Sequence, residues 1–215
     1  MSNLFAGAQN LGKSFMLPIA VLPAAGLLLG FGGVFTNPVT LSTYPALNSE
    51  VIQAIFTVMK LCGSVVFDNL SLLFAVGIAV GMARSDKGTA GLAAVLCYIV
   101  MNKAINASLL LSGTLATDNL AAVGQASVMG VTTLQTGVMG GIMSGLLAFR
   151  VQKRFGKTEL PNLLAFFSGS RFVPIVSSFF AIFLGVALFW VWPPIQTGIT
   201  HLGGLVEKTG YIGTL

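Results

Sequence analysis

Charged residues are scarce in this sequence, and their scarcity excludes most soluble folds. Only 8% of the 215 residues are Asp, Glu, Lys or Arg, whereas soluble globular domains average about 25%. The 11 basic and 6 acidic side chains cannot cover the surface of a soluble domain of this size. Hydrophobic residues make up 55% of the chain, and the mean hydropathy is +0.90. The composition therefore predicts an integral membrane protein and not a soluble protein with an unusually apolar core.

The side chains that usually perform chemistry are also few. His201 is the single histidine, and without an HExxH pattern no metal site is predicted. Cys62 and Cys97 lie in separate apolar segments without CxxC spacing, which favours free buried thiols over a disulfide. Nucleotide-binding glycine loops are missing, and carboxylates are rare within the apolar runs, which argues against a proton relay. We therefore predict no catalytic residue and no cofactor, and we attribute the net charge of +5 to anionic lipid and not to nucleic acid.

Long apolar runs are abundant, and they have the length of membrane-spanning helices. A helix needs about 20 mostly apolar residues to cross a bilayer. A membrane β-barrel would show segments of about 10 residues that alternate apolar and polar side chains, and runs such as AGLAAVLCYIVM do not alternate. The predicted fold is an all-α integral membrane protein with about five transmembrane helices and additional amphipathic or interfacial helices. The expected spans are residues 15–35, about 66–83, 89–111, about 134–149, and 172–192.

The distribution of basic residues predicts which loops face the cytoplasm. Lys and Arg are enriched in cytoplasmic loops of membrane proteins. Residues 36–50 and 112–133 contain neither Lys nor Arg, so these two loops are expected outside. The basic residues outside these loops that flank the predicted spans are Lys13, Arg84, Lys87, Arg150, Lys153, Arg154, Lys157 and Arg171. This pattern predicts a cytoplasmic N-terminus, and it makes Arg171 the last cytoplasmic charge before the fifth span, where it can reach lipid phosphates or cap a loop.

Two apolar segments have a second interpretation. The first span follows Lys13 and contains small residues near position 25, as a secretory signal peptide does, but its apolar run continues to Phe35 and is longer than a signal sequence requires. Residues 51–69 carry apolar side chains at spacings of three and four. This favours an amphipathic helix at the outer interface, and the alternative is the lower part of a long, tilted second helix.

Glycine spacing predicts where helices pack closely. Small residues four positions apart allow membrane helices to approach each other backbone to backbone. Gly137, Gly141 and Gly145 form such a series on the fourth span, and the pairs Gly26–Gly30 and Gly77–Gly81 have the same spacing. These glycines can serve packing within one chain or a contact between two subunits, and the spacing alone does not distinguish the two.

Several segments resemble one family of membrane transporters. Residues 157–175, KTELPNLLAFFSGSRFVPI, resemble the KxxLPxxLxFFxGxRFVPI signature of phosphotransferase-system sugar permeases, the enzyme IIC domains of the glucose/maltose/N-acetylglucosamine class. Further similar segments follow in the family's order: GKSFMLPIAVLPAAGLLLG, FDNLSLLFAVGIAVGMARSDKG, AVLCYIVMNKAI, TGVMGGIMSGL and VWPPI. The resemblance covers nearly the whole chain. It implies a multi-pass protein of the bacterial inner membrane that works as a homodimer in sugar transport.

The resemblance also implies which parts of such a permease these residues contain. The family's GLHH-type and TEP-type sugar-contacting segments do not occur in residues 1–215, nor does the CxTRLR phosphoacceptor of enzyme IIB. The implied role is the N-terminal scaffold and dimerisation half, which would handle a glucose- or maltose-type sugar only together with the missing half. No sugar-binding residue is assigned. An alternative is a non-transporting assembly or regulatory module that pairs with a full-length permease.

A phosphorylated enzyme IIB domain is the partner implied on the cytoplasmic side. The loop before the fifth span is its expected docking site, because the charge pattern places this loop in the cytoplasm. The candidate docking residues are Phe166, Phe167, Gly169, Arg171 and Phe172.

Overall fold

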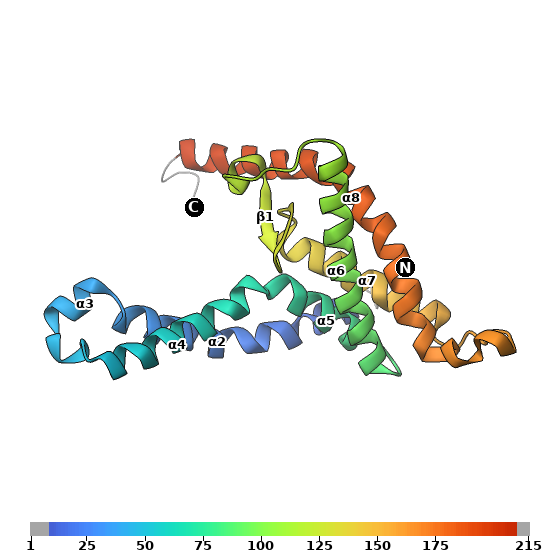
Figure 1. The fold of residues 1–215 in the computed structure, drawn as a ribbon, viewed down its shortest axis with the longest axis horizontal. Helices are drawn as coiled ribbons and strands as arrows, with labels where there is room; N and C mark the ends of the chain where they lie inside the picture. The colour runs from blue at the N-terminus through green and yellow to red at the C-terminus, as the bar shows by residue number, and fades with distance from the viewer. Residues whose placement is uncertain (1–8, 210–215) are drawn as a thin grey trace.

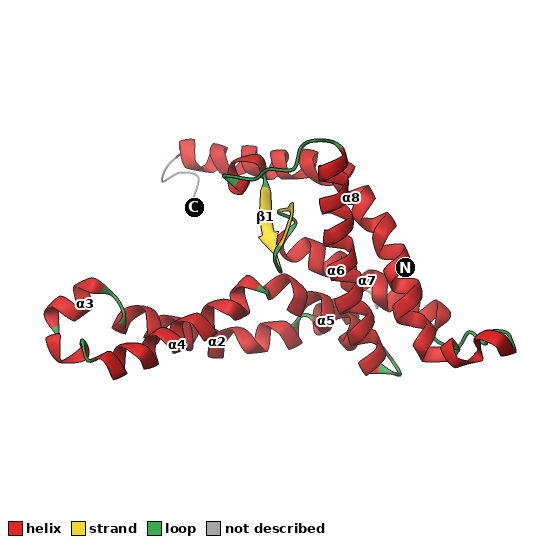
Figure 2. Ribbon diagram, in the orientation of Figure 1, coloured by secondary structure: helices red, strands yellow, loops and turns green. Residues whose placement is uncertain are grey.

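The computed structural model describes residues 9–209, and it is a helical membrane fold as predicted (Figures 1 and 2). A short helical segment at residues 9–14 precedes the first long helix. The helices are α2 (Met16–Phe35), α3 (Pro38–Thr43), α4 (Glu50–Asp68), α5 (Leu70–Met82), α6 (Lys87–Leu111), α7 (Gly137–Phe155) and α8 (Phe172–Thr209). Two strands, β1 (Gln125–Val128) and β2 (Val131–Leu134), form an antiparallel hairpin, and 3₁₀ turns occupy Pro45–Leu47, Leu120–Val123, Asn162–Phe167 and Gly169–Arg171.

Four helical segments of the described residues have the length and apolar composition to cross a membrane, namely Gln9–Phe35, Glu50–Asp68, Lys87–Leu111 and Gly169–His201. The second span expected at residues 66–83 is displaced, because Asn69 separates α4 from a 13-residue α5. The Asn69 side-chain amide donates to the Val65 carbonyl at 2.9 Å, where α4 ends. Residues 51–68 therefore lie on α4, a separate helix with the length and apolar composition of a span, and not on the lower part of one long helix that continues into α5.

The fourth expected span also has different bounds. Leu134 belongs to β2, and α7 begins only at Gly137 and continues to Phe155. The last turn of α7 carries Lys153 and Arg154, so the apolar part of this helix is shorter than a span requires. This composition explains why α7 is not among the four long apolar helices.

α2 and α4 form a helical arm that extends from the rest of the protein (Figure 1). The two helices touch backbone to backbone at Gly32, which lies against Lys60, and at Gly63, which lies against Leu29. A stacked pair of Phe35 and Phe56, with ring centroids 4.5 Å apart, closes the seam near the tip. The missing glycine side chains are what allow this close approach.

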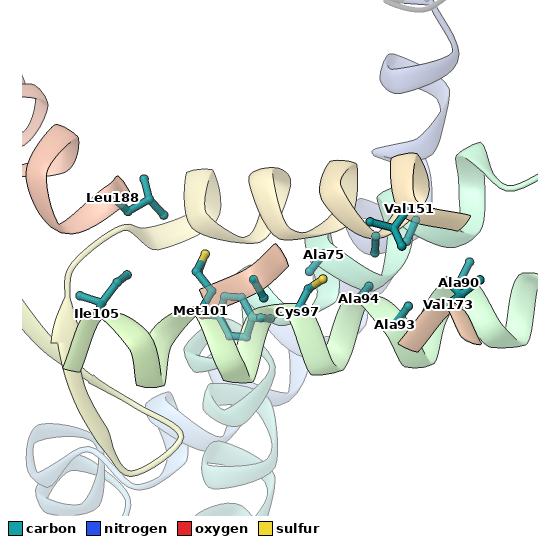
Figure 3. Packing of buried hydrophobic residues seen from close by; sticks show 14 of the residues in the cluster. Ala75, Ala90, Ala93, Ala94, Cys97, Met101, Ile105, Val151, Val173 and Leu188 are labelled. Atoms are coloured by element: carbon teal, nitrogen blue, oxygen red, sulfur yellow. The ribbon is translucent and has the colours of Figure 1, made fainter. Parts of the chain in front are cut away.

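The buried core lies among α5, α6, α7 and α8, with small side chains of α6 in the middle (Figure 3). Gly141 lies against the backbone carbonyl of Ser71, and a Cβ atom at Gly145 would lie 2.5 Å from the Ala75 carbonyl oxygen. These two glycines therefore pack α7 onto α5 within one chain. Gly137 has open space around it and a φ of +52° at the first residue of α7, so it does not take part in this packing.

The last helix is longer than the predicted span of residues 172–192. α8 continues through Pro193 and Pro194 to Thr209, and it changes direction along its length (Figure 1). Two adjacent prolines remove two backbone donors and bend a helix without necessarily ending it. A span predicted from hydropathy ends where the apolar run ends, whereas this helix continues as a more polar segment.

The β-hairpin was not predicted, because residues 112–133 were expected to form only a loop. Its turn residues Met129 and Gly130 have φ values of 50° and 78°, as a type I′ turn requires. The hairpin is attached to the helices by two hydrogen bonds: Asn106 Nδ2 donates to the Thr132 carbonyl at 2.8 Å, and Trp192 Nε1 donates to the Gln135 carbonyl at 3.1 Å.

Candidate docking site at the basic end of the bundle

Three segments that are distant in the sequence meet at one end of the helical bundle. They are the segment before α2, the α5–α6 loop, and the end of α7 with the loop that follows it, and together they surround a hollow of about 1040 Å³. Four basic residues line this hollow, Arg84, Lys153, Arg154 and Lys157. The sequence predicts these residues on one side of the membrane, and the structure gathers them at one end.

A single side chain connects two walls of this basic hollow. Gln152 of α7 donates through Nε2 to the Ser85 carbonyl at 2.8 Å and to the Asp86 carbonyl at 3.0 Å. Both carbonyls belong to the α5–α6 loop, in which Asp86 adopts a left-handed conformation with a φ of 48°. Gln152 thereby fixes the distance between α7 and this loop. The sequence offers no signal for this contact, because the two segments are more than 60 positions apart.

The candidate docking loop connects α7 to α8 and contains two 3₁₀ turns, Asn162–Phe167 and Gly169–Arg171. Gly169 stands between them with a φ of +67°, which favours glycine. Its amide donates to the Thr158 carbonyl at 2.9 Å, and the Ser168 hydroxyl accepts from the Leu160 amide at 2.9 Å. Gly169 thus determines the conformation of the loop and does not offer a side chain to a partner.

Arg171 caps this loop. One guanidinium nitrogen donates to the Phe166 carbonyl at 3.2 Å, and the guanidinium carbon lies 5.0 Å from the centre of the Phe166 ring. Capping a loop is one of the two roles that the sequence allows for this residue. Because the arginine holds both the carbonyl and the ring of Phe166, it determines how the aromatic tip of the loop is presented.

The tip of the loop exposes apolar side chains. Leu163 is 97% exposed and Phe166 is 71% exposed, and Phe167 lies beside the Phe166 ring with centroids 5.3 Å apart. Phe172 differs, because it is half-buried and packs edge-to-face on Phe155 of α7 at 6.2 Å. Of the five predicted docking residues, Phe166, Phe167 and Arg171 form the outer surface, and Gly169 and Phe172 support it from within.

The two cysteines and the histidine do not line the basic hollow. Cys97 is buried and free, as predicted, but Cys62 is exposed on α4, so the prediction that both thiols are buried is wrong for Cys62. His201 borders a separate groove of about 920 Å³ between α8 and the segment before the hairpin. Within residues 9–209, no three His, Cys, Asp or Glu side chains are grouped as metal ligands.

The fold and this end of the bundle define a class of protein, a helical multi-pass membrane protein with four basic residues around one hollow. The chain belongs to the family described as Phosphotransferase system, EIIC, which matches residues 12–215. It is accordingly a membrane component of a sugar phosphotransferase permease, and membership implies interaction with an EIIB partner.

The orientation of the basic end is tested by single cysteines in a variant that lacks Cys62 and Cys97. In sealed right-side-out vesicles, an impermeant thiol reagent should label Thr117→Cys in the loop before the hairpin and leave Lys153→Cys unlabelled. Both positions should react after permeabilisation, which controls for accessibility. Labelling of Lys153→Cys in the sealed vesicles would contradict a cytoplasmic basic end.

Proposed function

We propose that residues 1–215 act as the scaffold of a glucose- or maltose-type sugar permease and dock its phosphorylated EIIB domain through the loop at Asn162–Arg171. The observation that carries this proposal is the exposed aromatic tip capped by Arg171, in a chain of the EIIC family. An apolar tip beside basic side chains suits a partner that has an apolar patch and carries a phosphoryl group.

The scaffold role is supported by how α5, α6, α7 and α8 pack. Gly141 and Gly145 bring α7 onto α5, and Gly185 brings α8 onto α6, where a Cβ atom would lie 2.6 Å from both the Met101 carbonyl oxygen and the Ala104 Cβ. Contacts of this kind leave the helices little freedom to slide, because sliding one helix along the other brings larger side chains against the facing backbone. A permease needs such a rigid body against which a sugar-carrying part can move.

Arg171 provides the direct test of docking. In lipid nanodiscs, the 215-residue chain should bind a phosphorylated EIIB domain of a glucose- or maltose-type system. Arg171→Ala should weaken binding at least about tenfold, because the tip loses the hydrogen bond to the Phe166 carbonyl and a hydrogen bond from a charged group contributes about 1.5–3 kcal/mol. Arg171→Lys should lose part of the affinity, because an ammonium cannot both hold the carbonyl and lie flat over the ring.

Arg150→Ala is the matched control for docking, because Arg150 is an exposed basic residue of α7 that does not line the hollow. It should leave EIIB affinity within about twofold of the wild type, a change expected of a single exposed charge. Equal losses in Arg150→Ala and Arg171→Ala would show attraction by net charge and not docking at the loop. Tighter binding of an EIIB domain from another sugar class would contradict the glucose/maltose assignment.

We also propose a homodimer, and the structure directs its test to α2. Gly26 and Gly30 have no other atom within 4 Å of the position of a Cβ, so this face of α2 is open, unlike the glycine face of α7. Gly30→Ile should lower the dimer fraction in nanodiscs about tenfold, because overpacking at a close helix contact costs about 1–3 kcal/mol. Cross-linking across a dilution series measures this fraction, and a strictly monomeric wild type would refute the dimer.

A further inference from the structure

The basic hollow carries more charge than the docking proposal uses. Four basic residues and one acidic residue, Asp86, line it, so the formal charge of the lining is 4 − 1 = +3. These side chains come from two different loops and from the end of α7, and Gln152 holds the two sides together. A hollow with exposed cations on opposite walls is suited to a phosphate group, which offers oxygen acceptors in several directions.

The backbone at the rim of the hollow favours an anion as well. Asp86 is the residue before α6, and its side chain makes no capping hydrogen bond to that 25-residue helix. The first amides of a helix carry a partial positive charge that attracts anions when no side chain caps them. The start of α6 therefore adds to the field of the four basic side chains.

An apolar surface begins beside the hollow, and it distinguishes a lipid from a soluble anion. Asn10 lines the hollow, and Ser14 of the same segment lies against Gly81, which also lines it. α2 starts directly afterwards with Met16, which is 69% exposed, and Leu17, which is 55% exposed. A ligand that has both a phosphate and hydrocarbon chains can use the hollow and this apolar flank together, whereas a free phosphate can use only the hollow.

We infer that the hollow binds the headgroup phosphate of an anionic phospholipid, with the acyl chains along the exposed start of α2. Arg84, Lys153, Arg154 and Lys157 supply the charged contacts. The lipid bridges the α5–α6 loop and the end of α7, and so stabilises the base from which the docking loop extends. Basic pockets between membrane helices on the cytoplasmic side are known to suit such headgroups. This inference stands independently of EIIB docking.

The test uses the delipidated 215-residue chain in a neutral detergent, titrated with phosphatidylglycerol or with phosphatidylcholine. Native mass spectrometry counts retained lipid, and the melting temperature reports stabilisation. Phosphatidylglycerol should be retained and should raise the melting temperature, and phosphatidylcholine should do neither. Lys153→Gln with Arg154→Gln should weaken phosphatidylglycerol binding about 25-fold, at about fivefold for each neutralised side chain.

Two further variants keep the result interpretable. Arg150→Gln removes one exposed charge of the same helix outside the hollow and should change lipid affinity by less than about twofold. Arg84→Gln, on the opposite wall, should weaken lipid binding about fivefold and replaces the double variant if that variant does not fold. Equal losses in Arg150→Gln and Arg84→Gln would overturn the site in favour of a general charge effect.

Competition distinguishes the other sources of phosphate. Millimolar inorganic phosphate should displace little phosphatidylglycerol, because it cannot use the apolar flank; complete displacement would assign the hollow to a soluble anion and overturn the lipid proposal. If the double variant binds lipid as the wild type does but loses EIIB binding, the hollow is part of the protein docking surface and the lipid site is refuted. Loss of EIIB binding in Arg171→Ala with unchanged lipid binding supports two separate sites.

Discussion

Gly141→Ile should lower the free energy of unfolding by about 3 kcal/mol or more, the upper range for overpacking, because the added side chain would meet a backbone carbonyl. A Cβ atom at this position collides with the carbonyl oxygen of Ser71 on α5, and backbone atoms cannot rotate away as a flexible side chain can. The expected result is loss of the folded fraction, measured by melting temperature and by size-exclusion chromatography in detergent.

Gly30→Ile is the matched control for this prediction. It makes the same change of side chain on a membrane helix, but the site is open. The free energy of unfolding of the monomer should therefore change by less than about 0.5 kcal/mol. A Gly141→Ile chain that melts as the wild type does but loses its dimer would contradict the structure. That outcome would instead place Gly141 in a contact between two subunits, which its spacing also allows.

Gln125→Leu should produce the second largest loss of stability, about 1–3 kcal/mol, since two hydrogen bonds to a partly exposed segment would be lost and each contributes about 0.5–1.5 kcal/mol. Gln125 is 4% exposed at the start of β1. Its amide nitrogen donates to the Thr114 carbonyl at 2.7 Å, and its amide oxygen accepts from the Ala116 amide at 3.0 Å. This one side chain therefore holds the segment that leads from α6 to the hairpin.

The loss should be local and visible at that segment. Amide hydrogen exchange at Ala116 should accelerate strongly in Gln125→Leu, and a protease should cut residues 112–124 sooner. Ser127→Ala, on the same strand but exposed, should leave both rates near those of the wild type. Unchanged exchange at Ala116 in Gln125→Leu would show that the hairpin is held by its helix contacts at Asn106 and Trp192 and not by Gln125.

Much of the fold could be predicted because the bilayer constrains the chain so strongly. Few charges and long apolar runs are enough to indicate helices, since no other open structure satisfies its backbone hydrogen bonds in lipid. The ends of the membrane spans were harder to predict where polar and apolar residues mix. Asn69 interrupts one expected span, and Lys153 and Arg154 shorten the apolar part of another. A single polar or charged side chain at a helix end acts locally, so it leaves the average hydropathy of the segment almost unchanged.

The docking role of the loop before α8 stays a prediction, whereas its local structure is described. Phe166, Phe167, Gly169 and Arg171 share one loop of short 3₁₀ turns because they are close in the sequence, and Phe172 begins α8. Their division into an exposed tip and an inner support could not be predicted. It depends on Phe155 of α7, on which Phe172 packs, and on Thr158, whose carbonyl binds the Gly169 amide.

By itself the sequence determined that this protein is helical and lies in a membrane, and it indicated which basic segments share one side, because these properties depend on composition and on order along the chain. Only the tertiary structure decided that Gly141 packs within the chain while Gly30 stays open, and that Arg84 and Lys153 line one hollow. The physical reason is that glycine spacing and charge are properties of single helices and loops. Which surface each one meets depends on contacts between segments as distant in the sequence as Gln152 and Asp86.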